Sequence, residues 1–446
     1  MSVSRRHVIG ASAAAGALGI SAGVAGTLGF SGRGSRAGAG SGPAPRQPDT
    51  TGVGGAQVEP FHGPHQAGVE TLPQAHARFV ALELLDGTRA ADAVRMLRLL
   101  TDDAAALTQG RAPLADSEPE LVANPARLTV TVGFGRNLVA LAGTGPDVLP
   151  DWLAPLPGFS IDALDPARSR GDLLLQVCGD DPFVLSHAVR MLLKDTRAFA
   201  RVAWVREGFR RAYGAQPQGT TLRNLFGQVD GTANPGPGSE DFARLVWGET
   251  LGLENPVFSA RGEPPTDLAA HHPAWLRGGT TLAIRDIRMD LETWDEADRP
   301  AREFSVGRKL DSGAPLSGSD EFDVPDFEAK DALGLSRISP ASHVARSRNE
   351  QDPAEQIYRR VYNYESAEVT ADGAEPSAAG TVPVNRAGLV FASFQADLER
   401  QFLPIQRRLD QMDLLNQWTT PIGSTVWAVP PGVAEDEYLG ETLFGR

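Results

Sequence analysis

The spacing of apolar and polar residues predicts an alternation of strands and helices in the first half of the chain. Alternating or continuous apolar positions are typical of strands, and apolar residues three and four positions apart are typical of helices. Asp181 and Pro182 have the residue types expected of an N-cap and a first helical position. The order of elements is β-α-β-β-α-β, which fits a ferredoxin-like unit. The predicted strands cover residues 76–85, 127–135 and 171–179, and the predicted helices cover residues 91–107 and 181–196.

The second half of the chain repeats this theme. Residues 278–294 start as a strand, residues 387–395 form a strongly apolar strand, and residues 397–412 have the spacing of an amphipathic helix. One face of that helix carries Leu398, Phe402, Ile405 and Leu409. Residues 296–356 are polar and rich in loop residues. We therefore expect an α+β fold made of two halves that meet near residue 220.

The first thirty residues have the pattern of a targeting segment. Arg5 and Arg6 precede a weakly apolar, uncharged run from Val8 to Phe30, which resembles a twin-arginine export signal. A membrane-spanning helix is the alternative, because the run is long enough, but the run contains few of the residues that favour insertion. The sequence predicts export by the twin-arginine machinery to the periplasm, the cell envelope or the outside, and leaves signal cleavage open.

The segment after the signal is predicted to be a flexible linker. Residues 31–59 are rich in Gly, Ser, Pro and Ala and lack the apolar surface needed to fold. Ordered structure is therefore expected to begin near Phe61. The predicted organisation is a signal segment (1–30), a linker (31–59), an N-terminal domain (60–220) and a C-terminal domain (221–446).

Composition narrows the possible functions. The chain has 446 residues, of which 41% are hydrophobic, so it can bury a sizeable core and exceeds the length at which single cores tend to divide. The formal net charge is −14 and there is no block of Lys or Arg, so we expect no nucleic-acid partner. Cys178 is the only cysteine, which excludes internal disulfides and cysteine-based metal clusters. We expect it to be a small buried residue on a strand.

Two segments contain residues that could do chemistry. NLFGQVDGTANP, residues 224–235, contains dipeptides typical of a turn, and this pattern alone leaves open whether Asp230 also does chemistry. His343 precedes a run of arginines, namely Arg346, Arg348, Arg359 and Arg360. No HExxH or Cys-His spacing supports a zinc site. The remaining histidines are therefore expected to be solvated or packed: His7, His62, His65, His76, His187, His271 and His272.

With other segments, these two resemble the dye-decolorising peroxidases, a family of haem peroxidases. NLFGQVDGTANP is similar to the family's Gly-x-x-Asp-Gly signature, which alone would be weak evidence. Six further segments resemble the family in the same order, and together they cover nearly everything after the linker. They are FHGPHQAGV (61–69), LRGGTTLAIRDIRMDLETWD (276–295), VGRKLDSGAPLSG (306–318), SHVARSRN (342–349), YRRVYNY (358–364) and LVFASFQADLERQFLPIQRRL (389–409).

The resemblance implies a fold, a cofactor and a set of site residues. The implied fold has two ferredoxin-like domains with antiparallel sheets, arranged like a dimeric α/β barrel, and one haem b per chain held in the C-terminal domain. His343 would be the proximal iron ligand, Asp230 the distal acid-base residue and Arg359 the distal cation. Gly227 and Gly231 would let the backbone bend close to the haem.

The chain departs from the family pattern after His343. Family members often have His-Ile-Arg-x-Ala-Asn-Pro-Arg there, whereas this chain has His343-Val-Ala-Arg-Ser-Arg-Asn-Glu. Contacts to the haem propionates are therefore open, with Arg346 and Arg348 as candidates. A carboxylate on the other nitrogen of the ligand imidazole would strengthen its donation. Asp397 is a candidate for that carboxylate, and an ordinary helix N-cap is the alternative.

The resemblance implies a peroxidase that reduces hydrogen peroxide and oxidises dyes, phenols or other aromatic donors. Because aspartate ordinarily ionises at lower pH than histidine, we expect dye oxidation to be fastest at acidic pH. One alternative is a deferrochelatase, which releases iron from haem, leaves the porphyrin intact and works beside iron-transport components. Another is a haem carrier without turnover, and a homo-oligomer is also left open. Aromatic residues that could relay electrons, with packing as the alternative, are Tyr358, Tyr362, Tyr364 and Trp294.

Overall fold

The computed structural model describes residues 54–249, 268, 272–366 and 386–445, which all belong to one compact unit, Val53–Arg446. The predicted export signal, the predicted linker up to residue 53, and His271 lie outside the described residues. Within the described ranges, no helix is long and apolar enough to cross a membrane.

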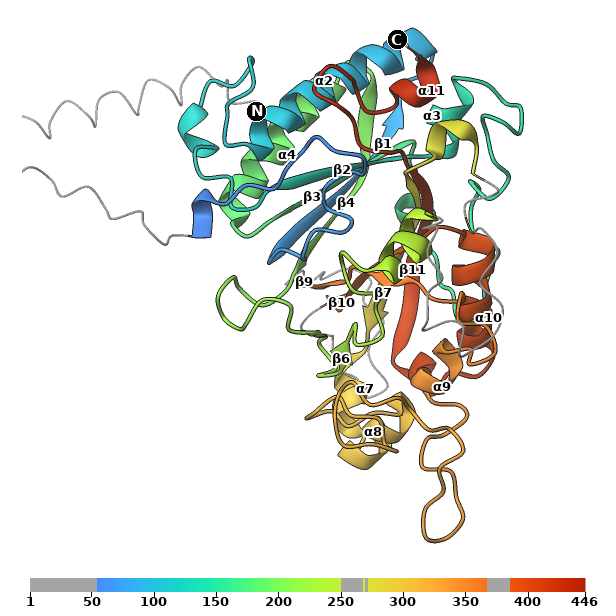
Figure 1. The fold of residues 1–446 in the computed structure, drawn as a ribbon. Coiled ribbons are helices and arrows are strands. Elements are labelled where there is room, and N and C mark those ends of the chain that lie inside the picture. The colour runs from blue at the N-terminus through green and yellow to red at the C-terminus, as the bar shows by residue number, and fades with distance from the viewer. Residues whose placement is uncertain (1–53, 250–267, 269–271, 367–385, 446) are drawn as a thin grey trace, which may run out of the picture. The chain divides into compact units, whose positions relative to one another are not determined.

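The first half forms the predicted ferredoxin-like unit. Its four antiparallel strands lie in the order β2-β3-β1-β4, and α2 and α4 lie side by side against the sheet (Figure 1). Helix α4 begins as predicted, because the Asp181 carboxylate accepts a hydrogen bond from the Phe183 N–H at 2.9 Å and Pro182 opens the first turn. The elements are β1 (His76–Leu84), α2 (Ala90–Thr108), β2 (Thr129–Phe134), β3 (Leu173–Gly179), α4 (Pro182–Thr196) and β4 (Ala200–Phe209).

The second half repeats the arrangement with strand order β11-β7-β10-β9. Its strands are β7 (Thr280–Met289), β8 (Tyr358–Arg359), β9 (Tyr362–Ser366), β10 (Arg386–Gln395) and β11 (Thr419–Val429). The strand predicted over residues 387–395 is confirmed as β10. The strand that starts in 278–294 ends at Met289, because the Asp290 carboxylate caps the next helix by accepting the Thr293 N–H at 3.1 Å. The helix predicted over 397–412 is a π-helical turn, η6 (Leu398–Phe402), followed by α10 (Leu403–Met412).

The two sheets join into one closed, barrel-like antiparallel sheet. Residue Ala428 on β11 pairs with Phe134 on β2, and Phe209 on β4 pairs with Asn363 on β9. Each seam consists of one residue pair, so the closure is made at the ends of these strands and not along their length. Side chains from both halves fill the interior, including the fully buried Trp427. Cys178 is free and buried in the same interior, as the sequence predicts.

The connection between β7 and β8 is largely loop, as predicted, but contains three short helices, of which α9 carries His343. These are α7 (Leu291–Glu296), α8 (Arg299–Val306) and α9 (His343–Ser347). Figure 1 shows α7, α8 and α9 near one another beyond the lower ends of β7 and β11. The remaining helices and strands are α3 (Arg136–Ala140), β5 (Leu222–Arg223), β6 (Val229–Asp230), α5 (Glu240–Phe242), η4 (Ala243–Trp247) and α11 (Glu441–Phe444). Single-turn 3-10 helices are η1 (Gly54–Ala56), η2 (Pro119–Leu121), η3 (Pro166–Arg168), η5 (Ala274–Leu276) and η7 (Leu414–Gln417).

The linker prediction is wrong for its last six residues, 54–59. The main-chain carbonyls of Gly55 and Gln57 accept hydrogen bonds from the N–H groups of Ala126 and Arg127, both at 2.8 Å. The Glu59 carboxylate also forms an ion pair with the nearly buried Arg127 guanidinium at 2.8 Å. Composition alone did not reveal these contacts, because the partners lie more than sixty residues further along the chain.

Candidate active site

The segment NLFGQVDGTANP forms a turn that presents Asp230. It begins as a hairpin loop between β5 and β6, where the Asn224 Oδ1 accepts the N–H groups of Phe226 and Gln228, both at 3.1 Å. Gly227 has a φ of 79° and Gly231 a φ of 123°, so both adopt backbone conformations that favour glycine. A Cβ at Gly227 would meet no described atom within 4 Å, so its backbone angle explains the glycine better than crowding does.

Asp230 and Arg359 form an ion pair. Arg359 Nη1 donates to Asp230 Oδ1 at 3.0 Å, although 129 residues separate the two in sequence. Both side chains are largely buried, with 13% of Asp230 and 21% of Arg359 exposed. Arg359 reaches this position because β8 pairs with β10 at Ser393. The structure therefore brings together the two residues that the resemblance assigned to the distal side.

His343 forms the second pair of the site. It is the first residue of α9, whose N-cap Ser342 accepts the Ala345 N–H at 3.4 Å. Its Nδ1 lies 2.6 Å from Asp413 Oδ2, and the Asp413 side chain is only 3% exposed. Burial alone would lower the pKa of His343, but the charge and hydrogen bond of Asp413 oppose this and the net pKa is raised. With Nδ1–H donating to Asp413, the ring presents Nε2 for ligation.

Asp413, not Asp397, is therefore the carboxylate on His343. Asp397 is a helix N-cap, the alternative that the sequence left open, and its carboxylate accepts the N–H groups of Glu399 and Arg400 at 2.9 and 3.0 Å. Asp413 follows the last residue of α10, and its other oxygen accepts the Leu415 N–H at 3.0 Å, which aims Oδ2 at the imidazole. No local pattern predicts this pairing, because the two residues are 70 positions apart.

Electrostatics connect the two pairs. The charges of Arg359 and Asp230 both act on the His343 imidazole, in opposite directions, so the three side chains share one region of the fold. Arg308 and Arg348 belong to the same region. Burial lowers the pKa of Arg308, and the charges of Arg359 and Arg348 lower it further. The site is therefore rich in positive charge.

The arginines divide into two groups. Arg308 was missed as a site residue, although it lies in the VGRKLDSGAPLSG segment, and it donates to the carbonyls of Gly313 and Glu321, both at 2.7 Å. In the part of the chain that the structure describes, Arg348 has no acidic partner. Arg346 is instead held on α10, because it donates to the Arg408 carbonyl at 3.1 Å and to Gln411 Oε1 at 3.2 Å. The geometry favours Arg308 and Arg348 over Arg346 as partners of an anionic group.

These residues fit a haem. An imidazole anchored at Nδ1 suits axial ligation of iron, and the convergent arginines suit the carboxylates of the propionates. The apolar porphyrin ring needs apolar side chains to pack against. Ile287 on β7 and Phe391 on β10 can provide them, because both are only half-buried although most residues of these adjacent strands are buried. Phe391 packs against two apolar clusters, one that contains Leu389 and one that contains Phe402.

A closed sheet of two ferredoxin-like halves, with an anchored imidazole near an Asp-Arg pair, is the arrangement expected of a haem peroxidase. Residues 66–210 match the family model described as "Dyp-type peroxidase, N-terminal", and residues 221–434 match the one described as "Dyp-type peroxidase, C-terminal". The chain belongs to the Dyp-type peroxidase family. The matches confirm the family resemblance and the fold class that the sequence suggested.

Similar proteins carry two different names. The chain is 37% identical over 387 residues to the dye-decolorizing peroxidase of Thermobifida fusca (strain YX), covering 85% of this chain and 83% of the relative. It is 34% identical over 403 residues to the deferrochelatase of Escherichia coli O157:H7, covering 87% of each.

Solved structures agree with the family and the cofactor. A Dyp-type peroxidase from Cellulomonas bogoriensis is 44% identical, with a TM-score of 0.76, and the match covers 88% of this chain and 99% of that one. DtpA from Streptomyces lividans, described in its ferric form, is 37% identical with a TM-score of 0.75, covering 88% of this chain and 98% of DtpA. The protein is a haem-dependent peroxidase that reduces hydrogen peroxide with electrons from reducing substrates.

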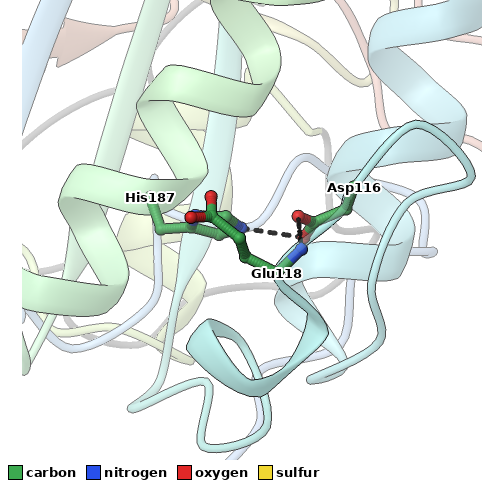
Figure 2. A group of neighbouring side chains, drawn as sticks. All are labelled: Asp116, Glu118 and His187. Carbon is green, nitrogen blue, oxygen red and sulfur yellow. Dashed lines mark hydrogen bonds and ion pairs between the residues drawn. The ribbon is translucent and has the colours of Figure 1, made fainter. Parts of the chain in front are cut away.

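A second group of His and acidic side chains lies in the N-terminal half, where His187 of α4 meets Asp116 and Glu118 (Figure 2). His187 Nε2 lies 2.8 Å from Asp116 Oδ2, and Arg190 Nη2 lies 2.9 Å from His187 Nδ1. A guanidinium only donates hydrogen bonds, so Nδ1 accepts and Nε2 carries the hydrogen that Asp116 accepts. Arg190 also pairs with Glu118. The guanidinium charge disfavours a cation, so this group is a hydrogen-bonded network that fixes α4, and His187 is packed as predicted.

Asp195, near the end of the same helix, offers a test of stability against pH. Burial and the nearby Asp103 raise the pKa of Asp195 to about 7. The Asp195 carboxyl therefore keeps its proton in the folded chain at pH values at which the unfolded chain has released it, that is, above about pH 4. The stability that this group allows below pH 4 is lost as pH rises to about 7. Asp195→Asn should raise the free energy of unfolding at pH 8 by about 1–2 kcal/mol, a value reduced for partial exposure, and change it little at pH 4.

Chemical denaturation at the two pH values measures this difference. Asp151→Asn is the control, because Asp151 is exposed. An equal effect of Asp195→Asn at pH 4 and pH 8 would contradict the retention of a proton by Asp195 in the folded chain.

Proposed function

We propose that His343 ligates the haem, that Asp230 carries the proton and that Arg359 stabilises charge while hydrogen peroxide is reduced and dyes, phenols or other aromatic donors are oxidised. The observation that carries the proposal is the Asp230–Arg359 pair at 3.0 Å, in electrostatic contact with the His343–Asp413 pair. The experiment that tests it is the reaction with hydrogen peroxide of variants at Asp230 and Arg359.

Haem supplies the iron at which the oxygen–oxygen bond of hydrogen peroxide is broken, and reduction to two waters takes two protons and two electrons, the electrons coming from the donors. Asp230 Oδ1 is bonded to Arg359, while its Oδ2 has no protein partner in the described chain. Oδ2 could accept a proton from hydrogen peroxide and return it to the departing oxygen. This gives the carboxylate of the turn a chemical role.

One nitrogen of the Arg359 guanidinium is available to donate a hydrogen bond to a ligand. Its Nε and Nη1 are bonded to Asn234 and Asp230, and its Nη2 meets no acceptor among the described residues. A guanidinium is a charged group rich in donors. Nη2 can therefore donate to the oxygen on which negative charge grows.

Asp413 holds His343 for ligation, and its removal has an expected signature. Asp413→Asn keeps the size of the side chain and loses its charge, so it should weaken donation by the imidazole. We expect a fall of about 10- to 100-fold in haem affinity or peroxide-reaction rate, together with a more positive midpoint potential of the iron. Spectroelectrochemistry of the haem-loaded protein measures the potential.

Asp397→Asn is the matched control for this experiment. Asparagine is as good an N-cap as aspartate, so this variant should behave like the wild type. The opposite ranking, with Asp397→Asn shifting the potential and Asp413→Asn not shifting it, would contradict the role of Asp413.

The deferrochelatase activity is a second candidate function, because a relative of that name is 34% identical across 87% of the chain. In that case iron leaves the haem, the porphyrin ring stays intact, and the protein works beside iron-transport components. The two activities differ in product. Fluorescence of metal-free protoporphyrin after incubation of the haem-loaded protein would indicate iron release, and oxidised donor without that fluorescence supports the peroxidase. A carrier without turnover would give neither product.

The aromatic residues considered for electron relay are all buried. Tyr358, Tyr362, Tyr364 and Trp294 are between 0% and 6% exposed. Trp294 stacks on Phe226, with ring centroids 4.4 Å apart, and Tyr358 packs edge-on against Phe242 at 4.9 Å. Their packing explains these positions, so none of the four is assigned as a surface site for bulky donors.

Export by the twin-arginine route is also proposed, with the periplasm, the cell envelope or the outside as destination. The support is the Arg5-Arg6 pair followed by the mild apolar run. Replacing both arginines by lysine should retain the protein in the cytoplasm. Fractionation of cells that express the two forms tests this, and equal export of both would overturn the route.

A further inference from the structure

We propose that Asn234 is a positioning residue that fixes the guanidinium of Arg359, an inference that rests on the proposed function of Arg359. Asn234 Oδ1 accepts hydrogen bonds from the Arg359 main-chain N–H at 3.2 Å and from its Nε–H at 3.3 Å. Asn234 Nδ2 donates to the Arg359 carbonyl at 2.8 Å. One amide side chain thus holds the backbone and the side chain of the same arginine.

The backbone bonds explain why an amide is needed. Strand β8 has only two residues, and the Arg360 N–H donates to the Ala392 carbonyl on β10 at 2.8 Å. In an antiparallel pair, successive residues direct their N–H and C=O groups to opposite sides, so those of Arg359 point away from β10. A side-chain amide carries the same donor and acceptor as a peptide group. Asn234 therefore takes the place of a neighbouring strand at Arg359.

Asn234 and Asp230 act on Arg359 from the same turn. The Asn234 N–H donates to the Gly231 carbonyl at 2.9 Å, which closes the turn directly after Asp230. Asp230 then holds Nη1 and Asn234 holds Nε, so the planar guanidinium is fixed at two of its three nitrogens. Without Asn234, Arg359 could rotate about its bond to Asp230 and Nη2 would lose its direction.

The surrounding charges do not replace this contact. Glu321 is the acidic group next to the turn, but its Oε1 accepts from Thr221 at 2.6 Å and from Thr232 at 3.0 Å. Arg308 is positive and repels Arg359. Asp230 is thus the acid that pairs with Arg359 among the described residues, and Asn234 supplies the remaining orientation.

Fluoride binding to the haem-loaded protein reports the orientation of Arg359 without turnover. Fluoride is a small anion that accepts a hydrogen bond from a distal guanidinium, and its affinity is read from the shift of the haem absorption band. Asn234→Ala should weaken fluoride binding by about 10- to 100-fold, as expected for the loss of a hydrogen bond to a charged group. Arg359→Leu should weaken it at least as much.

Asn137→Ala is the matched control. Asn137 also joins two elements by a side-chain bond, since its Nδ2 donates to Asp172 Oδ1 at 2.8 Å, but it lies in the N-terminal half. This variant should bind fluoride like the wild type. Asn137→Ala therefore shows whether the loss of an asparagine contact elsewhere in the chain is enough to weaken fluoride binding.

Asn234→Asp gives a second, isosteric test with a pH signature. Its ionised carboxylate should reduce fluoride affinity relative to the wild type near pH 7, because it adds negative charge beside Arg359. Its protonated form has an acceptor and a donor where the amide has them, so the difference from the wild type at the same pH should shrink as pH falls and the new carboxyl takes up a proton. A purely structural defect would not recover in this way.

The outcomes separate this inference from the proposed function. In one outcome the wild type binds fluoride, Arg359→Leu does not bind it, and both Asn234 variants bind it as well as Asn137→Ala does. The positioning role of Asn234 is then overturned, and the role of Arg359 stands. If the wild type and Arg359→Leu bind fluoride equally, the proposed role of Arg359 fails first. If Asn234→Ala does not retain haem, the pH dependence of fluoride binding by Asn234→Asp tests the proposal instead. A loss of fluoride affinity in Asn234→Asp that is the same at every pH would overturn the proposal.

Discussion

Replacing Asp230 by Asn is expected to slow the reaction of the haem-loaded protein with hydrogen peroxide by about 10²- to 10⁴-fold, the range for loss of a general acid-base group. Asparagine keeps the size of the side chain and can still accept from Arg359, but it cannot take a proton. The change should therefore affect proton transfer and leave haem retention intact. Stopped-flow absorption after mixing with hydrogen peroxide measures the rate.

Asp241→Asn is the control for this variant. Asp241 lies in α5, a short distance along the chain, and pairs with Arg244 at 2.9 Å, outside the site. Its substitution should leave the rate unchanged. A rate in Asp230→Asn within threefold of the wild type would contradict the role of Asp230, and a water molecule or another acid would have to carry the proton.

Replacing Arg359 by Leu is expected to slow the same reaction by about 10²- to 10³-fold, comparable with the loss of one preorganised donor to a developing negative charge. The physical reason differs from that for Asp230, because the proton acceptor remains and the stabilising charge is lost. Arg359 also contacts Asp230, so the two effects should not add in the double variant. Full additivity would indicate that the residues act independently.

Arg197→Leu is the control for charge, because Arg197 is exposed at the end of α4. The variant should react with hydrogen peroxide at the wild-type rate. If Arg359→Leu also reacted at that rate and bound haem normally, Arg359 would be a structural residue and not the distal cation.

Local patterns predicted much of the fold. The alternating strands, the helices and the Asp181 cap depend on residues close in sequence, and the structure places them within a few positions of the predicted limits. Strand β11 was not predicted, although it closes the C-terminal sheet. The closure itself depends on single pairs such as Ala428 with Phe134, which no local pattern encodes.

The site also combines residues that local patterns reveal with partners that they do not reveal. The Gly-x-x-Asp-Gly turn and His343 could be found from short segments, and the family resemblance supplied their implied roles. The partners could not be found in this way, because Asp413 is 70 residues from His343 and Asn234 is 125 residues from Arg359. Asp397 was a candidate because it starts the helix after the apolar strand 387–395, and the structure shows that it caps this helix.

The central claim is that this chain is a haem peroxidase, and one measurement tests it most directly. The wild-type protein is loaded with haem and mixed with hydrogen peroxide in a stopped-flow spectrometer, and an aromatic dye is then added. The account predicts a change of the haem absorption band within milliseconds, its return as the dye is oxidised, and no metal-free porphyrin. A haem band that does not respond to hydrogen peroxide, with dye left unoxidised, would contradict it.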